Sequence, residues 1–199
     1  KISKAMIEEI AKAGFQTIRI PVTWDVHMDE KGQIDAAWMG RVQEVVDEAL
    51  DTGMYVILNA HHDTWYIPSK ENEAYAKEMM EKAMKEVKAI DSIIVAHCED
   101  ESELQPGACI NEGNYAKEHD LVGINNASEY NHAIRDLKLA DEIKNRYHIC
   151  HISTKETVLA LAKARETNKL VSGEACPHHL ILTDENIKDL NPNYKMNPP

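Results

Sequence analysis

Short apolar runs alternate with longer amphipathic segments along the chain, and this alternation limits the fold more than any other feature. The runs are rich in β-branched or aromatic residues and predict strands at 17–22, 54–58, 93–96, 147–150 and 170–175. Between them, apolar residues at helical spacing predict helices over 3–13, 36–51, 72–90, 127–144 and 155–167. Strands that alternate with helices are typical of a parallel sheet covered by helices. The sequence therefore predicts an α/β fold with about five parallel strands.

A closed barrel of β/α units has eight strands, so this arrangement is TIM-barrel-like but incomplete. The stretch 101–126 is rich in Gly and Pro and predicts a loop, with one helical turn near Tyr115. Thr154 is expected to cap the helix over 155–167, and Thr183 a short helix near 184–190. The chain contains no G-x-G-x-x-G and no P-loop, which argues against a nucleotide-binding version of the fold.

The composition restricts the partners of the chain. The net charge is −12 and the acidic residues are spread along the sequence, with no basic stripe. Nucleic acid and anionic membranes are therefore not expected as partners. The chain has no apolar run of membrane-spanning length and no signal-peptide pattern, so a cytoplasmic location is expected. Both ends look cut, and the four cysteines, none in a C-x-x-C pair, are expected to be buried reduced thiols.

Histidines follow four of the predicted strands. They are His61-His62, His97, His151 and His178-His179. The carboxyl ends of parallel strands meet at one edge of the sheet, and neutral imidazole is a common zinc ligand. The pattern predicts a metal site at this edge. For any one of these histidines, a hydrogen-bonded role without metal is the alternative.

The sequence motifs around the later histidines resemble those of a known family. The stretches are IIVAHCED (93–100), NEG (111–113), RDLKLA (135–140), YHICHISTKE (147–156), PHHL (177–180) and YKMNPP (194–199). In order and spacing they resemble dihydroorotase, a member of the amidohydrolase superfamily, and the resemblance covers residues 72–199. It implies zinc-dependent hydrolysis of a cyclic amide, the interconversion of carbamoyl-aspartate and dihydroorotate in pyrimidine biosynthesis.

The same resemblance implies roles for individual residues. His97 and His151 are expected to bind zinc, and Asn197 to contact the small-molecule substrate. The pair His178-His179 matches a structural strand end better than a ligand. Glu99 and its neighbour Asp100 are expected to be a solvated pair, with orientation of an imidazole as the alternative.

The front of the chain resembles a different family. The motifs that carry this second resemblance are GFQTIRIPVTW (14–24), IDAAWM (34–39), RVQEVVD (41–47) and GMYVILNAHHD (53–63). Residues 1–68 thus resemble family-5 glycoside hydrolases of the endoglucanase (cellulase) type. By this resemblance Arg19 steadies a catalytic carboxylate, His61 lines the sugar site, and His62 lies beside it. The seam between the two parts is expected near residues 67–75.

Each part lacks catalytic groups that its resemblance requires. Dihydroorotase relatives add a His-x-His pair, an arginine, a bridging carboxylate and an aspartate base, and none is recognisable in these 199 residues. The Asn-Glu-Pro word of family 5 is also absent. We therefore expect an incomplete catalytic set and weak or absent zinc. The alternatives are an endoglucanase-type fragment and an inactive chimeric barrel scaffold. Open sheet edges predict homo-oligomers.

Overall fold

The computed structural model describes residues 2–29, 32–61 and 73–199. The chain divides into two compact units, Lys1–Trp65 and Tyr66–Pro199, and each is described by itself.

The first unit consists of two β/α pairs. Its elements are α1 (Lys4–Lys12), β1 (Thr17–Val22), a 3₁₀ turn (Asp25–His27), α2 (Ala36–Asp51) and β2 (Tyr55–Ala60). Strands β1 and β2 pair in parallel. The Asp35 carboxylate caps α2 by accepting a hydrogen bond from the Trp38 amide at 2.8 Å. After each helix the chain turns at a glycine with positive φ, Gly14 at 93° and Gly53 at 83°, a conformation that glycine adopts without strain.

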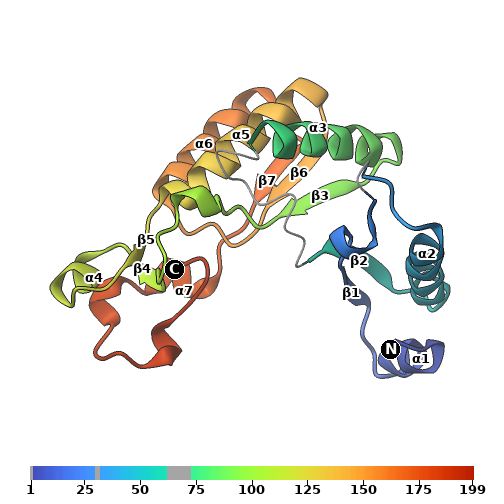
Figure 1. The fold of residues 1–199 in the computed structure, drawn as a ribbon, viewed down its shortest axis with the longest axis horizontal. Helices are drawn as coiled ribbons and strands as arrows, with labels where there is room; N and C mark the ends of the chain where they lie inside the picture. The colour runs from blue at the N-terminus through green and yellow to red at the C-terminus, as the bar shows by residue number, and fades with distance from the viewer. Residues whose placement is uncertain (1, 30–31, 62–72) are drawn as a thin grey trace. The chain divides into compact units, whose positions relative to one another are not determined.

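The second unit is larger. Its elements are α3 (Glu73–Ala89), β3 (Ile93–Ala96), β4 (Ile110–Asn111), α4 (Asn114–Glu118), β5 (Gly123–Ile124), α5 (Ala127–Ile143), β6 (Arg146–Ile149), α6 (Lys155–Thr167), β7 (Val171–Gly173) and α7 (Pro177–Ile181), with 3₁₀ turns at Glu101–Glu103, Asp184–Asn186 and Pro192–Tyr194. Strands β3, β6 and β7 form a parallel sheet in the order β3-β6-β7, and β4 pairs with β5 in parallel. Helices α3, α5 and α6 cover one face of the three-stranded sheet (Figure 1).

The β1-β2 sheet and the β3-β6-β7 sheet each bury one face and expose apolar side chains on the other. In the second unit Tyr147, Ile149 and Val171 are fully buried against the helices. Val95, which points to the opposite face of the sheet, is 48% exposed. In the first unit Ile20 is buried against α1 and α2, whereas Tyr55 on the opposite face of its sheet is 76% exposed. Strands that hold apolar residues on both faces are typical of parallel sheets whose two faces are both covered.

The α/β architecture with parallel strands is confirmed, and most elements begin and end where the sequence predicts. The five predicted strands correspond to β1, β2, β3, β6 and β7. Three stretches differ from expectation. The loop over 101–126 contains the short strands β4 and β5 in addition to the helix at Tyr115, residues 177–181 form helix α7, and the helix expected near 184–190 is one 3₁₀ turn over Asp184–Asn186.

In the part of the chain that the structure describes, no helix has both the length and the apolar character needed to cross a bilayer.

Candidate functional site

Two histidines meet at the carboxyl ends of neighbouring strands. His97 follows β3 and His151 comes two residues after β6, and these strands are adjacent and parallel. The Nδ1 atom of His97 lies 3.2 Å from the Nε2 atom of His151. His151 has a φ of 36°, an uncommon value for a residue with a side chain. A backbone conformation of this kind persists only where the surrounding structure holds it, so the loop after β6 is held in place by its neighbours. Such conformations are concentrated at functional sites.

The spacing of the two nitrogens fits a hydrogen bond between the rings, and it also fits two ligands of one metal ion. Zn–N bonds of about 2.0–2.1 Å in a tetrahedral site place two ligand nitrogens about 3.3 Å apart, close to the distance between these two rings. Burial, followed by the charge of His97, lowers the pKa of His151, which keeps this ring neutral and able to bind a metal. Among residues 2–29, 32–61 and 73–199, no third His, Cys, Asp or Glu joins the pair within 4.8 Å to complete a three-ligand group.

Glu99 contacts the imidazole pair, which corrects the expectation of a solvated carboxylate. Its Oε2 atom lies 3.5 Å from His97 Nε2, and its side chain is 19% exposed. The hydrogen bond with His97 lowers the pKa of Glu99, and an interaction with Asn197 lowers it further. A carboxylate on the Nε2 side of His97 favours the tautomer that leaves Nδ1 free to face His151. Asp100 instead caps a 3₁₀ turn, accepting a hydrogen bond from the Ser102 amide at 3.0 Å.

Glu99 also lines a small polar cavity, and neither histidine of the pair is among the lining residues. Its lining includes Glu99, Asn111, Ser153 and Asn197. The structure therefore brings the predicted substrate-contacting residue Asn197 close to Glu99, which in turn contacts His97. The cavity presents amides, hydroxyls and carboxylates, groups that can hydrogen-bond a small polar molecule.

Glu129 also lines this cavity and holds the loop that follows His151. It is buried in α5, and its two carboxylate oxygens accept hydrogen bonds from the amides and hydroxyls of Ser153 and Thr154 at 2.8–3.1 Å. Thr154 caps α6, as predicted, by accepting from the Thr157 amide at 3.3 Å. Sequence reasoning missed Glu129 because its four donors lie 24 and 25 residues further along the chain.

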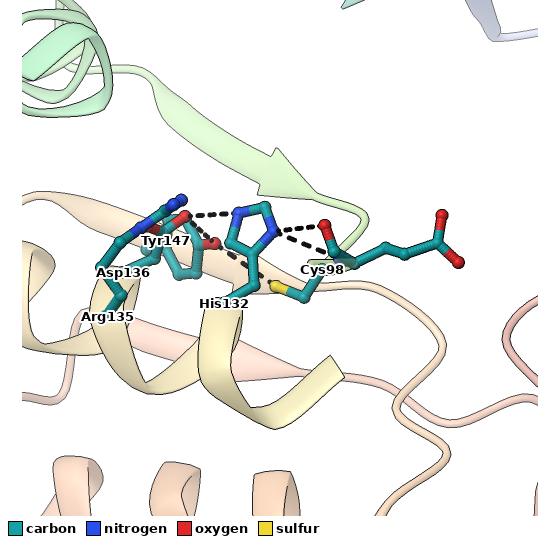
Figure 2. A network of polar contacts seen from close by, with 6 residues as sticks. Cys98, His132, Arg135, Asp136 and Tyr147 are labelled. Carbon is teal, nitrogen blue, oxygen red and sulfur yellow. Dashed lines mark hydrogen bonds and ion pairs between the residues drawn. The ribbon is translucent and has the colours of Figure 1, made fainter. Parts of the chain in front are cut away.

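A second buried network supports the end of β3, and its centre is Asp136. This carboxylate is 0% exposed and accepts hydrogen bonds from Tyr147 Oη at 2.8 Å and Arg135 Nε at 2.7 Å. His132 Nε2 lies 3.2 Å from Asp136, and His132 Nδ1 lies 3.1 Å from the Glu99 amide nitrogen. Figure 2 shows His132 between Asp136 and the backbone next to Cys98. The network thus ties α5 and β6 to the residues that follow His97.

The charges in this network perturb its acids. Burial alone would raise the pKa of Asp136, but the hydrogen bonds and charges of His132 and Arg135 outweigh it and lower the pKa below its ordinary value of 3.8. Burial and the Asp136 charge raise the pKa values of Tyr147 and Cys98. The Cys98 thiol therefore stays protonated and unreactive.

The described cysteines are all free, but only Cys98 is buried. Cys109, Cys150 and Cys176 are half-buried, so the expectation of buried thiols is correct for one of the four. Two of the half-buried cysteines stand in groups of possible metal ligands, Cys176 with His178 and His179, and Cys150 with His148 and Glu174.

The front unit places its candidate residues on and after the paired strands. Arg19 lies on β1 opposite Ile57 of β2 and is exposed on the face of the sheet that points away from the core. His61 follows β2, and its amide donates a hydrogen bond to the Val22 carbonyl at 2.9 Å. The other candidate of this part, His62, lies outside the described residues.

Comparisons with known proteins find relatives in two families, and their matches overlap along the chain. Residues 1–96 match the family described as Cellulase (glycosyl hydrolase family 5). The dihydroorotase of Bacillus subtilis is 49% identical over 121 residues, which cover 61% of this chain and 28% of the relative. The dihydroorotase of Geobacillus thermodenitrificans is 36% identical over 202 residues, which cover 95% of this chain and 46% of the relative. The chain is similar to two hydrolase families.

The fold of the chain is similar to that of solved endoglucanases from the family that matches residues 1–96. A broad-specificity endoglucanase of Clostridium longisporum superposes with a TM-score of 0.58 and 22% identity, over 89% of this chain and 53% of the endoglucanase. This likeness shows the TIM-barrel type of fold. The family match and the dihydroorotase relatives confirm both resemblances seen in the sequence. The chain spans less than half the length of the dihydroorotases it matches. Since the cellulase match ends at residue 96 and the longer dihydroorotase match covers 95% of the chain, the two overlap, and the seam near 67–75 stays a prediction.

Proposed function

We propose that the second unit is a metal-binding hydrolase unit of the dihydroorotase type, in which His97 and His151 hold zinc. The observation that carries this proposal is the distance of 3.2 Å between His97 Nδ1 and His151 Nε2, at the ends of two adjacent parallel strands. A zinc ion held by these two rings would supply Lewis-acid chemistry, namely polarisation of a carbonyl and a bound water of lowered pKa. The substrate class is a cyclic amide of the dihydroorotate kind.

Residues around the pair have supporting roles in this proposal. Glu99 orients the His97 ring through its Nε2 atom, and Glu129 fixes the loop after His151. Asn197 offers an amide group to a polar substrate beside Glu99. The neutral state of His151, favoured by its lowered pKa, keeps its ring available as a ligand.

The proposal is metal binding without turnover by these 199 residues. Two imidazoles fill half of a tetrahedral coordination sphere, so the affinity for zinc is expected to be weak. Opening a cyclic amide also needs a positioned base to move the proton, and the aspartate that serves this role in the relatives has no recognisable counterpart in the sequence.

Zinc binding to purified protein tests the proposal. We expect His97→Ala and His151→Ala each to remove about one equivalent of weakly bound zinc in equilibrium dialysis. His119→Ala is the matched control, because this ring stacks on Tyr115 and is predicted to have no part in binding. Equal zinc retention in the wild type and His97→Ala would contradict the site. Hydrolysis of dihydroorotate above the buffer rate would contradict the incomplete catalytic set.

A carbohydrate-binding role for the front unit is the second candidate. The cellulase match over residues 1–96 favours it. Arg19 is exposed on β1, and His61 follows the neighbouring strand β2. Retaining glycosidases need two carboxylates about 5–5.5 Å apart. The sequence shows no such pair, and the Asn-Glu-Pro motif that carries one of these carboxylates in family 5 is absent from it. We therefore expect no release of reducing sugar from soluble cellulose, and measurable release would instead establish an endoglucanase.

An inactive chimeric scaffold is the third candidate, and metal content separates it from the first. A chain that folds cooperatively but retains no zinc at His97 and His151 would favour the scaffold. A cytoplasmic location belongs to the dihydroorotase proposal and would be tested by fractionation of the source cells.

A further inference from the structure

A second cluster of metal-binding side chains lies at the start of α7. Cys176 precedes this helix, and His178 and His179 lie in its first turn. One ligand atom from each of the three residues lies within 4.8 Å of the other two. The two rings pack edge to face, with centroids 4.2 Å apart. The turn is closed by the His179 amide, which donates to the Cys176 carbonyl at 3.0 Å.

The hydrogen bonds of these histidines leave two nitrogens without partners. His179 Nε2 lies 3.2 Å from the Pro198 carbonyl oxygen. Since a carbonyl only accepts, Nε2 carries the proton and Nδ1 has a free lone pair. Within the described part of the chain, His179 Nδ1 and His178 Nε2 are both buried and have no hydrogen-bond partner. Buried nitrogens of this kind are unfavourable unless something binds them.

The other three-residue group does not share this feature. His148 Nδ1 contacts the Ser172 hydroxyl at 2.8 Å, and His148 Nε2 lies 3.5 Å from Glu174 Oε2. Both ring nitrogens of His148 therefore have partners in the protein. Ordinary polar contacts account for the group of His148, Cys150 and Glu174, whereas they leave the group at α7 unsatisfied.

We propose that Cys176, His178 and His179 bind one zinc ion, with water as the fourth ligand. A thiolate and two imidazoles are the soft and borderline donors that zinc prefers, at about 2.3 Å for sulfur and about 2.0–2.1 Å for nitrogen. The thiol of Cys176 releases its proton to solvent when it binds. The His179 Nε2 contact with Pro198 fixes the ring in the tautomer that presents Nδ1 to the ion.

This site would join three segments of the second unit. The ion would connect Cys176, at the end of the loop that follows β7, to the histidines of α7. The contact of His179 with Pro198 extends this connection to residues 194–199. That segment contains Asn197, which lines the polar cavity. The site uses neither His97 nor His151, so it is separate from the proposed hydrolase site and can exist whether or not that proposal is correct.

Cobalt titration of the reduced, metal-free full chain tests this site, because a thiolate bound to Co²⁺ gives a near-ultraviolet charge-transfer band and an imidazole does not. We expect the band to appear in the wild type and to be reversed by Zn²⁺. It should disappear in Cys176→Ser and persist in Cys150→Ser, the matched half-buried cysteine. His178→Ala and His179→Ala should each weaken Co²⁺ binding about tenfold or more, since the loss even of outer contacts costs this much.

Two further measurements keep the test decisive. The double variant His97→Ala/His151→Ala should retain the band, and its loss there would overturn a separate site. Zinc should protect Cys176 of the wild type from alkylation by iodoacetamide, as measured by mass spectrometry, which requires no variant to fold. No band in the wild type, a band that survives Cys176→Ser, or unchanged alkylation of Cys176 with zinc would each overturn the proposal.

Discussion

At the scale of single residues, two buried carboxylates hold the candidate site together. Asp136 lies in the apolar face of α5 and ties it to β6 through Tyr147. Glu129, two turns earlier on the same helix, binds the loop after His151. A buried charge is tolerated only where hydrogen bonds and opposite charges compensate for the lost water, and both residues meet this condition.

Replacement of Asp136 by Asn is expected to change how stability depends on pH. The pKa of Asp136 is lowered in the folded protein, so its contribution to stability is complete above the ordinary value of 3.8 and is lost as the pH falls through the lower folded value. Asp136→Asn should lose about 3–5 kcal/mol at neutral pH, the usual cost of breaking a buried charged pair. Below pH 3.8 the difference between variant and wild type should shrink, as measured by urea denaturation.

The control for this experiment is Asp141→Asn on the same helix. Asp141 pairs with Lys144 at 2.6 Å, but the pair is partly exposed and contributes little. A constant difference in stability between Asp136→Asn and the wild type across the acid range would show that the Asp136 charge is not what stabilises the network.

Glu129→Gln is expected to loosen the loop that carries His151. A glutamine has one acceptor oxygen and one NH₂ group, so half of the four donors from Ser153 and Thr154 would face another donor. We expect a loss of about 2–3 kcal/mol, since hydrogen bonds to charged groups are worth about 1.5–3 kcal/mol each. Guanidinium denaturation measures this loss, and Glu142→Gln, an exposed acid on α5, should change stability by less than about 0.5 kcal/mol.

The sequence indicates part of this site and misses the rest for a physical reason. His97 and His151 are recognisable because strand ends can be read from local apolar runs, and parallel strand ends converge. The partners of Glu129 lie 24 and 25 residues away, so no local pattern reveals its role. Asp136 gives a clearer signal, since it is a charged residue at helical spacing from the buried Ala133 and Ala140.

At the scale of elements, segments with a strong local pattern were predicted almost to the residue. Helices α2 and α6 and strands β1 and β3 have the predicted bounds. Strands β4 and β5 have two residues each, too few to show a period. The helix expected near 184–190 stops after one turn, and Leu190 beyond that turn is 70% exposed. In α7, Pro177 occupies the first turn, a favourable helix start that sequence reasoning took for a strand end.

Strand pairing between β4 and β5 depends on Gly123. A Cβ atom added there would lie 2.5 Å from the Glu112 Cα atom and 2.9 Å from its amide nitrogen, both backbone atoms that cannot move aside cheaply. Gly123→Ala should therefore destabilise the protein by about 1–3 kcal/mol, the usual cost of overpacking. Gly40→Ala, inside α2 with no atom within 4 Å of the added group, should stabilise by about 0.5–1 kcal/mol. Thermal unfolding monitored by circular dichroism compares the two, and equal effects would show that the close approach at Gly123 is not limiting.

At the scale of the whole chain, helices pack against one face of the β1-β2 sheet and one face of the β3-β6-β7 sheet, while the opposite faces carry exposed apolar side chains among the described residues. Tyr55 and Ile57 in the first unit, and Ile93 and Val95 in the second, are exposed apolar side chains on strands. In a closed barrel the residues on the equivalent face fill the interior. The two resemblances belong to barrel enzymes, and each unit supplies only some of the strands of such a barrel, so the side chains that would fill the interior are exposed.

Exposed strand faces and edges predict that the purified chain self-associates. Unpaired strand edges and apolar surface promote pairing with a second copy, and a charge on the strand opposes it. Ile57→Lys places a charge on the open face of β2, where the side chain is 44% exposed, and should shift the population toward monomer in size-exclusion chromatography with light scattering. Leu50→Lys is the matched control, because Leu50 is 52% exposed but lies on helix α2. A wild-type chain that stays monomeric at high concentration, or an equal response to both substitutions, would show that the open strand face does not drive association.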